Sequence, residues 1–389
     1  MRCERFRLSG DPAELVRQLR ALVPGAESVS AEVAQIIGLV RRDGDAAVVA
    51  YSRSFDTSGA EPRPLRVGEE ELDNAAERLD PDVRRGLERA IANVEAVAVA
   101  RAHREQTSVE LGTHVVRLRR VPVARAGVYV PGGRAPYPST VVMGVVPARV
   151  AGVPDIAVCA PPGADGDINP VILGACRLAG ASSVYRMGGA QAIAALAYGT
   201  ETVPPVDVIV GPGNLYVQEA KRQVFGQVGI DGFAGPSDLL LIADGDVDPE
   251  PLALDLLAQA EHGPGTLVIA ASPDASLLDA LGASVDGGAD TGAAAAIVSV
   301  EGPEEALALA EEFAPEHLQL AGSSAEALAS RVSRAGCVFV GEASGTAFGD
   351  YIAGSNHILP TGGAARFASA LSPEHFLRGV TEVRIEDGS

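Results

Sequence analysis

The sequence predicts an α/β protein made of two doubly wound, incomplete Rossmann-like domains that flank a cleft. Three observations predict this fold class. Short apolar runs alternate with helix-length segments from about residue 126 onward, loops rich in Gly and Pro separate them, and the 389-residue chain is 47% apolar. Such alternation implies crossover connections within a parallel sheet. Because doubly wound sheets bind ligands at the carboxyl ends of their strands, we expect the binding residues there, facing a shared cleft.

The chain up to about residue 116 has apolar residues at the three- and four-residue spacing that is typical of helices. The predicted helices are residues 12–22, 30–52, 69–79 and 81–104. The opening residues are interpreted as an N-terminal helical extension of the fold.

A first alternation of strands and helices follows this helical region. Apolar runs predict strands at residues 126–130, 156–159, 183–186 and 206–210, and helical spacing predicts helices at residues 169–178 and 190–197. The loop at residues 211–214 has the sequence Gly-Pro-Gly-Asn, which is typical of a sharp turn after a strand.

A second alternation indicates another α/β unit. Its predicted strands are residues 239–242, 267–270, 318–320 and 338–340, and its predicted helices are residues 251–261, 304–313 and 325–335. Residues 282–295 consist almost wholly of Gly, Ala, Asp and Ser, so we expect them to form a mobile surface loop.

Charge and cysteine content exclude several classes of protein. The net charge is −20, so we expect no nucleic acid partner, which would need basic patches. No apolar stretch follows the charged first residues, and no window approaches about 18 apolar residues, so neither a signal peptide nor a membrane span is expected. Four widely spaced cysteines favour a reducing, cytoplasmic location. The single lysine, Lys221, suggests a GC-rich coding genome.

The common cofactor and catalytic motifs are absent from the sequence. No G-x-G-x-x-G follows a predicted strand, and there is no GxxxxGK[ST], HExxH or G-x-S-x-G. Any nicotinamide cofactor must therefore be held without the usual glycine fingerprint.

Two short groups of polar residues are candidates for chemistry. Gln259 and His262 lie three residues apart at the end of a predicted helix, which suits two ligands of one metal, although such pairs also arise by chance. Glu316 and His317 lie between a predicted helix and strand, where they form either an acid/base pair or an ordinary turn.

A third group lies near the end of the chain. Asp350 and His357 belong to a stretch in which polar residues are packed among Gly and Pro, which is more typical of a site loop than of a solvated face. His375 is interpreted as a residue at a helix start rather than as a ligand.

Seven linked segments resemble the histidinol dehydrogenase family. They include Gly-Gly-Ala-Gln191, Gly-Pro-Gly-Asn214 and Pro-Glu316-His317-Leu, they occur in the family's order, and they cover roughly residues 10–380 of the chain. The full set of segments is residues 127–140, 188–196, 211–222, 234–238, 255–263, 315–318 and 349–361.

The resemblance implies a role for each matching residue. Zinc ligands would be Gln259, His262 and Asp350, and the catalytic acid/base pair would be Glu316 and His317. Substrate contacts would be Ser139, Ser237 and His357, and NAD contacts would be Tyr129, Gln191 and Asn214.

The resemblance also implies the reaction and the partners. The family oxidises L-histidinol through the aldehyde to L-histidine, within histidine biosynthesis, using two NAD and one zinc ion per site. A homodimer acting on a small-molecule alcohol is therefore expected.

The resemblance further implies a division into domains. Residues 1–20 would be the helical extension, residues 21–129 with 237–371 the domain that holds the zinc and catalytic residues, and residues 130–236 the NAD side. Residues 372–389 would be a remnant of the family's C-terminal segment, which is expected to be missing or vestigial.

That expectation leaves two alternatives open. One is a paralogue that oxidises a different small polar or amino alcohol, because the C-terminal segment carries substrate and zinc contacts in the family. The other is a binding protein without catalytic activity, which the presence of every matching acid/base and zinc residue disfavours.

Overall fold

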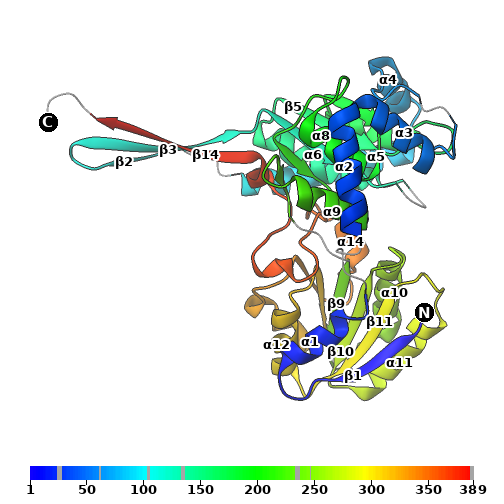
Figure 1. Cartoon of the computed structure of the whole chain (residues 1–389). Helices are drawn as coiled ribbons and strands as arrows, with labels where there is room; N and C mark the ends of the chain where they lie inside the picture. The colour runs from blue at the N-terminus through cyan, green and yellow to red at the C-terminus, as the bar shows by residue number, and fades with distance from the viewer. Residues whose placement is uncertain are drawn as a thin grey trace. The chain divides into compact units, whose positions relative to one another are not determined.

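The computed structural model describes residues 1–23, 29–60, 63–102, 106–132, 136–232, 237–245 and 247–385. The chain divides into two compact units, which Figure 1 shows with the chain coloured from one end to the other. Unit 1 comprises Met1–Ser28 and Gly232–Ala370, and unit 2 comprises Val29–Asp231 and Leu371–Ser389. Each unit is therefore assembled from two separate stretches of the chain.

Unit 1 contains a six-stranded parallel sheet, here sheet A, in the order β1-β11-β10-β9-β12-β13. Its strands are β1 (Cys3–Arg7), β9 (Asp238–Ala243), β10 (Leu267–Ser272), β11 (Ala294–Ser299), β12 (His317–Ala321) and β13 (Cys337–Val340). Its α-helices are α1 (Pro12–Arg20), α10 (Pro249–Ala260), α11 (Ala275–Gly287), α12 (Pro303–Phe313), α13 (Ser323–Glu326) and α14 (Thr346–Tyr351). Short 3₁₀ helices form at Ala329–Arg331 and Ala364–Arg366.

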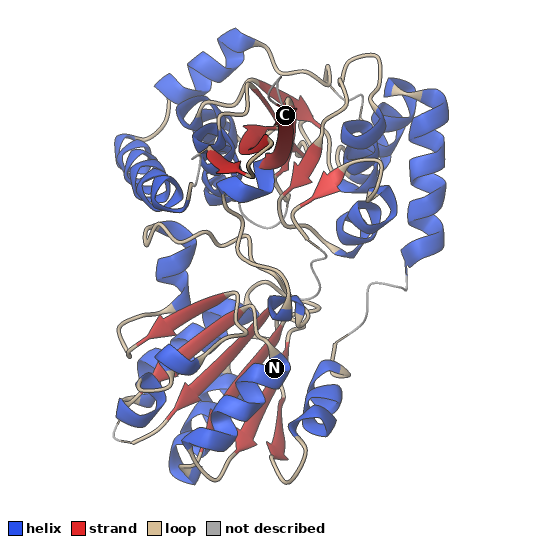
Figure 2. Ribbon diagram, turned by 90° about the vertical axis from the view of Figure 1, so that its left-hand side faces the viewer, coloured by secondary structure: helices blue, strands red, loops and turns tan. Residues whose placement is uncertain are grey.

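Helices cover both faces of sheet A, as Figure 2 shows. Strand β9 illustrates the consequence, because all of its residues are buried. Leu240 and Ile242 pack in the core beneath α1 and α12, whereas Leu239 and Leu241 pack in the core beneath α10 and α11. A strand that is buried on both faces is mostly apolar, and the continuous apolar run 239–242 is why the sequence pattern predicted β9.

Unit 2 contains a five-stranded parallel sheet, here sheet B, in the order β6-β5-β4-β7-β8. Its strands are β4 (Arg125–Tyr129), β5 (Asp155–Ala160), β6 (Ser183–Arg186), β7 (Val208–Val210) and β8 (Gly229–Ile230). Its α-helices are α2 (Ser30–Asp43), α3 (Asp45–Phe55), α4 (Glu69–Glu77), α5 (Pro81–Arg101), α6 (Pro138–Ala151), α7 (Pro170–Ala179), α8 (Gly189–Tyr198) and α9 (Leu215–Val224), with a 3₁₀ helix at Pro373–Phe376.

An antiparallel arm also belongs to unit 2. It is a three-stranded sheet in the order β14-β3-β2, made of β2 (Thr107–Glu110), β3 (His114–Pro122) and β14 (Leu377–Ile385). Figure 1 shows the arm extending away from the rest of unit 2. Residues 372–385, expected as a terminal remnant, thus form a 3₁₀ helix and one strand of this arm.

The two parallel sheets share one strand order. In each, the first strand is central, the second and third follow on one side, and the fourth and fifth lie on the other; sheet A adds β1 beside its third strand. This confirms the prediction of an α/β protein with two parallel sheets. In both sheets the order reverses between the first and fourth strands, β9 and β12 in sheet A and β4 and β7 in sheet B.

Several expectations about the first half of the chain are wrong. The opening residues are not only helical, because β1 pairs in parallel with β11. Strand β1 lies at the edge of the sheet and is only half-buried, so it contains charged residues and lacks the continuous apolar run by which strands such as β9 were predicted. Residues 29–129 lie in unit 2 rather than with residues 237–371, because α2 packs on α8 and α9, α4 on α7, and α5 on α6.

The loop expected at residues 282–295 is also wrong. Helix α11 continues to Gly287 and β11 begins at Ala294. The small side chains of this stretch are needed for close packing, since Gly282 lies against Ile297. In the part of the chain that the structure describes, no helix is both long enough and apolar enough to cross a membrane.

Candidate active site

The acid/base candidates of unit 1 lie at the amino edge of sheet A. Asp238 is the first residue of β9 and His317 is the first residue of β12, and these strands are neighbours. Ser237 and Glu316 directly precede them. The expectation that binding residues lie at the carboxyl ends of the strands is therefore wrong for this sheet.

Backbone packing closes the carboxyl edge at the same pair of strands. An added Cβ on Gly322 would lie 2.0 Å from the Asp244 carbonyl oxygen, and Gly322 has a φ of +92°. The Asp244 carboxylate also accepts a hydrogen bond from the Ala325 N–H in α13 (3.0 Å). At the carboxyl edge of sheet A, the close approach of Gly322 to Asp244 and the start of α13 therefore occupy the place where a ligand would bind.

Glu316 is held by hydrogen bonds from two neighbours. Its Oε2 accepts from the Ser237 hydroxyl (2.6 Å) and from the Asp238 N–H (3.0 Å). Its own N–H donates to the Asp238 carboxylate (2.6 Å). Burial, together with the nearby Asp238 charge, raises the pKa of Glu316 to about 8. A buried carboxyl with a raised pKa can hold or release a proton near neutral pH.

Arg20 supports Asp238 from the N-terminal stretch of unit 1. Its guanidinium lies 3.5 Å from the Asp238 carboxylate, donates to the Phe313 carbonyl (2.6 Å) and stacks 4.1 Å from the centre of the Phe313 ring. Burial raises the pKa of Asp238, and the Arg20 charge opposes that rise. The Arg20–Asp238 pair thus holds in place the Asp238 carboxylate that accepts the Glu316 backbone N–H.

His317 is oriented so that one ring nitrogen is free for chemistry. Its Nδ1 lies 3.3 Å from the Asp238 carbonyl oxygen. Because a carbonyl only accepts hydrogen bonds, Nδ1 is the donor, and Nε2 carries the lone pair of the neutral ring. Burial lowers the pKa of His317, partly opposed by the Asp350 carboxylate. The ring is therefore neutral at pH 7 and able to accept a proton.

The proposed zinc ligands Gln259, in the last turn of α10, and His262, just after α10, belong to the same group of residues. The Gln259 side-chain amide donates to the Ser237 hydroxyl (2.7 Å), so Ser237 links Gln259 to Glu316. His262 Nδ1 donates to the Gln259 carbonyl (2.9 Å). That bond leaves the His262 Nε2 lone pair for a ligand.

Asp350 and His357 join this group. Burial lowers the pKa of His357, while the Asp350 carboxylate acts in the opposite direction and the charges of His317 and His262 add to the lowering. These side chains are thus close enough to interact electrostatically. The His357 Nε2 atom is buried with no hydrogen-bond partner among the described residues, so it is free for a polar group of a bound molecule.

Within the described ranges, no three His, Cys, Asp or Glu side chains converge closely enough to hold a metal ion. The proposed ligand set contains only two residues of these types, His262 and Asp350, with the Gln259 amide oxygen as its third donor.

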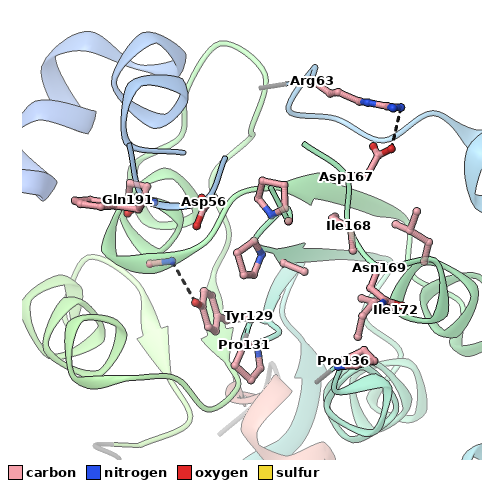
Figure 3. A pocket seen from close by; sticks show the side chains of 18 of the residues that line it. Asp56, Arg63, Tyr129, Pro131, Pro136, Asp167, Ile168, Asn169, Ile172 and Gln191 are labelled. Carbon is pink, nitrogen blue, oxygen red and sulfur yellow. Dashed lines mark hydrogen bonds and ion pairs between the residues drawn. The ribbon is translucent and has the colours of Figure 1, made fainter. Parts of the chain in front are cut away.

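Unit 2 contains a pocket of about 1370 Å³ at the carboxyl edge of sheet B, shown in Figure 3. The three residues expected to contact NAD, Tyr129, Gln191 and Asn214, all line it. Tyr129 ends β4, and its hydroxyl accepts a hydrogen bond from the Gly189 N–H (3.1 Å). Burial raises the pKa of Tyr129, so the phenol stays neutral. Asn214 caps α9 by accepting from two backbone N–H groups.

One wall of this pocket carries a half-buried acid. Asp56 follows α3, and its Oδ2 is buried without a hydrogen-bond partner among the described residues. Burial raises the pKa of Asp56 to about 6. Two stacked aromatic rings, Tyr51 and Phe55, also line the pocket, with Phe55 two-thirds exposed. On the opposite side in Figure 3, Arg63 forms an ion pair with Asp167 (2.9 Å).

Ser139, the remaining expected substrate contact, is not among the residues that unit 1 brings together. It is half-buried in the first turn of α6 in unit 2, and it does not line the pocket.

The motifs did not single out Asp56, Arg20 or Asp238 as functional. Asp56 lies after a helix in a stretch without a motif, and Arg20 is 218 residues away from Asp238. Asp238 ends the matching segment 234–238, directly after Ser237, so that motif could have pointed to it, whereas only the tertiary structure reveals Arg20 and Asp56.

Comparison with known proteins agrees with this architecture. The family described as histidinol dehydrogenase matches residues 23–388. A histidinol dehydrogenase from a Synechococcus species is 46% identical over 359 residues, which is 90% of this chain and 83% of that protein. One from Parasynechococcus marenigrum is 44% identical and covers 99% of this chain and 90% of that protein.

This chain belongs to the histidinol dehydrogenase family.

A crystal structure of histidinol dehydrogenase from Elizabethkingia anophelis matches the fold with a TM-score of 0.89. It is 32% identical and covers 99% of this chain and 90% of that one. An acetylating aldehyde dehydrogenase from Geobacillus thermoglucosidasius, at 12% identity and a TM-score of 0.52, shares the fold alone. Membership of the histidinol dehydrogenase family implies that NAD and zinc are used.

Proposed function

We propose that this protein oxidises L-histidinol through the aldehyde to L-histidine, with zinc bound in unit 1 and NAD in the pocket of unit 2. The observation that carries the proposal is the buried Glu316–His317 pair. Hydrogen bonds hold the neutral His317 ring and the Glu316 carboxyl, whose pKa is raised. Gln259, which bonds to the same Ser237 hydroxyl, and His262 belong to the same group. The family match supplies the substrate.

His317 is the base in the first oxidation. Its neutral Nε2 takes the hydroxyl proton of the alcohol as the carbon loses hydride, and its Nδ1 bond to the Asp238 carbonyl holds the ring in the tautomer that this step requires. Gln259, His262 and Asp350 would hold zinc, which would anchor and orient the substrate, and NAD would supply the hydride acceptor.

Glu316 is the base in the second oxidation. The aldehyde must add water before it can lose a second hydride, and Glu316 deprotonates that water. A carboxylate whose pKa is raised by burial is a stronger base than an exposed one, and the Ser237 and Asp238 donors keep it in place.

The donor atoms of unit 1 fit a zinc ion. The Gln259 amide N–H donates to Ser237, and His262 Nδ1–H donates to a carbonyl. The Gln259 amide oxygen and the His262 Nε2 therefore remain as donor atoms for a zinc ion. Together with the Asp350 carboxylate they form the mixed N and O set of a catalytic zinc site with an open position.

The pocket of unit 2 fits a dinucleotide that lacks a 2′-phosphate. The unpaired Asp56 oxygen can accept a hydrogen bond from a ribose hydroxyl and would repel a phosphate in the same place. The exposed face of Phe55 offers a surface for a base to stack on.

The antiparallel arm supports a homodimer. Val109, Val116 and Val383 lie directly opposite one another across its three strands, and Leu118 and Ile385 share their face. All of these except Val116 are exposed. An apolar sheet face left in water is unfavourable, so we assign this face to contact with a second copy of the chain.

The dimer is tested by Val383→Asp, which places a charge on the apolar face. We expect the variant to sediment as a monomer in analytical ultracentrifugation at concentrations where the parent is a dimer. Thr381→Asp tests the same face nearer the body of unit 2, and Arg384→Ser on the opposite face is the matched control. A parent that is already monomeric, or a dimeric Val383→Asp variant, contradicts this assignment.

The activity is tested by counting NADH formed per L-histidinol consumed, with zinc added and with zinc removed by a chelator. We expect two NADH per histidinol with zinc bound, and loss of turnover on chelation that added zinc restores. Zinc-loaded, folded protein that forms no NADH from histidinol but does so from another small amino alcohol would move the assignment to a paralogue.

A further inference from the structure

The single lysine of the chain is buried in unit 2, close to the NAD pocket but not part of its lining. Lys221 lies on α9 and is 1% exposed. Every other basic side chain among the 31 Lys and Arg residues is an arginine. Because Lys221 is almost fully buried, we expect that the larger planar guanidinium of an arginine does not fit at this position.

Lys221 forms a buried ion pair that encloses one glycine. Its Nζ donates to the Gly211 carbonyl (3.0 Å) and pairs with the Asp231 carboxylate. The other oxygen of Asp231 accepts from the Gly211 N–H (2.8 Å). Both backbone polar groups of Gly211 are therefore fixed by one ion pair, and Gly211 and Asp231 lie ten residues before and ten residues after Lys221.

Gly211 begins the turn that carries a proposed NAD contact. Its φ is +117°, and an added Cβ would lie 2.1 Å from the Tyr129 carbonyl oxygen, so the turn is pressed against the end of β4. Two residues later the Gly213 carbonyl accepts from the Gln218 side chain (3.0 Å). The turn then ends at Asn214, which caps α9 and lines the pocket.

We propose that the Lys221–Asp231 pair is a positioning device that sets the Gly211–Asn214 turn against Tyr129 and thereby determines the affinity for NAD. A buried ion pair adds little net stability, because desolvation of the charges offsets their attraction, but it strongly favours one arrangement of the groups it binds. Here that arrangement places Tyr129 and Asn214 at one edge of the pocket. The inference rests on the proposed function only in taking NAD as the ligand of this pocket.

The test compares Lys221→Met, Asp231→Asn and the double variant with the parent. NAD binding is measured directly by equilibrium dialysis with NAD, and the KM for NAD and for histidinol are measured separately. We expect each single variant to bind NAD at least about tenfold more weakly, since small misplacements of a binding group have effects of this size or larger. The KM for histidinol and the zinc content should change less than about twofold, because those groups lie in unit 1.

The double variant and two further variants sharpen the test. The double variant should be no worse than the worse single variant, because the two side chains act as one unit. Lys221→Arg should weaken NAD binding as well, and unchanged binding would contradict the argument from side-chain size. Arg177→Met, which removes a cation from an exposed ion pair on α7 outside the pocket lining, is the matched control and should bind NAD as the parent does.

The outcomes separate this inference from the proposed function. A parent protein that binds NAD but forms no NADH from histidinol contradicts the proposed function. The comparison of NAD binding between the parent and the variants by equilibrium dialysis still tests the positioning role in that case. Folded Lys221→Met and Asp231→Asn variants that bind NAD within about twofold of the parent overturn the positioning role. If neither variant folds, the pair serves stability alone, which overturns it equally.

Discussion

The two parallel sheets of this protein have the same strand order but use opposite edges. In sheet B the pocket residues lie at or after the carboxyl ends of the strands, as at Tyr129, which ends β4, and Asn214 after β7. In sheet A the reactive residues precede the strands, as at Glu316 before β12. Strand order therefore locates the point of reversal but does not decide which end of the strands becomes a site.

What fills each edge explains the difference. At the reversal point of sheet A, Gly322 and Asp244 are in backbone contact at the carboxyl edge, and α13 starts there. The amino edge of the same strands instead carries buried acids and imidazoles that bind one another. In sheet B, the loops after β4 and β5 contain Pro131, Pro161 and Pro162, which line a wide pocket rather than filling it. The rule that open α/β sheets bind ligands at the carboxyl ends of their strands therefore holds where the loops at that edge leave space for a ligand.

The largest expected effect comes from the amino edge of sheet A. His317→Ala removes the proposed base and should lower kcat by about two to four orders of magnitude. Binding of NAD, measured by equilibrium dialysis, should stay within about twofold because the pocket belongs to unit 2. His375→Ala is the control, since that ring hydrogen-bonds to Ser372, the N-cap of its own 3₁₀ helix in unit 2. Equal loss of NAD binding and turnover in His317→Ala would show that the amino edge of sheet A and the carboxyl edge of sheet B do not have separate roles in catalysis and NAD binding.

A smaller effect is expected at the carboxyl edge of sheet B. Asp56→Asn keeps the size of the side chain but removes its charge, and hydrogen bonds to charged groups contribute about 1.5–3 kcal/mol. The KM for NAD should rise about tenfold, with little change in kcat, and use of NADP should improve relative to NAD. Asp165→Asn is the matched control, because Asp165 lines the same pocket but already accepts the Asp167 N–H. Identical kinetics for the two variants would refute a role for Asp56.

The smallest effect is expected at the closed edge of sheet A. Asp244→Ala removes the bond to the Ala325 N–H and should lower the free energy of unfolding by about 1 kcal/mol, measured by urea denaturation. Turnover should be unchanged. Asp238→Ala, at the opposite end of the same strand β9, should instead reduce turnover strongly because it releases the Glu316 backbone. A loss of activity in Asp244→Ala would mean that the carboxyl edge of sheet A also takes part in function.

The sequence predicted the buried parts of this fold better than its exposed parts. Strands such as Leu239–Ile242 are apolar throughout because helices cover both faces, and that pattern can be recognised locally. Strand β3 mixes valine with arginine, and one of its two partners, β14, lies more than 250 residues later, so nothing near β3 in the sequence indicates that pairing. The edge strand β1 was missed for the same reason.

The candidate site divides in the same way. The residue types that carry out chemistry, such as His317 and Gln259, were recognisable from motifs. The groups that orient them were not, because Asp238 acts on His317 through a backbone carbonyl and Arg20 reaches Asp238 from the other end of unit 1. Hydrogen bonds of this kind depend on tertiary structure and leave no spacing in the sequence.

The pairing of β1 with β11 also has a consequence for synthesis of the chain on the ribosome. Because almost 290 residues separate the two strands, β1 leaves the ribosome long before its partner exists. All five strands of sheet B have been synthesised by residue 230, so this sheet can form cotranslationally, whereas unit 1 still waits for its C-terminal half and the arm of unit 2 waits for β14. During that interval the nascent β1 is an unpaired edge, and the charges of Glu4, Arg5 and Arg7 discourage it from pairing with strands of other chains.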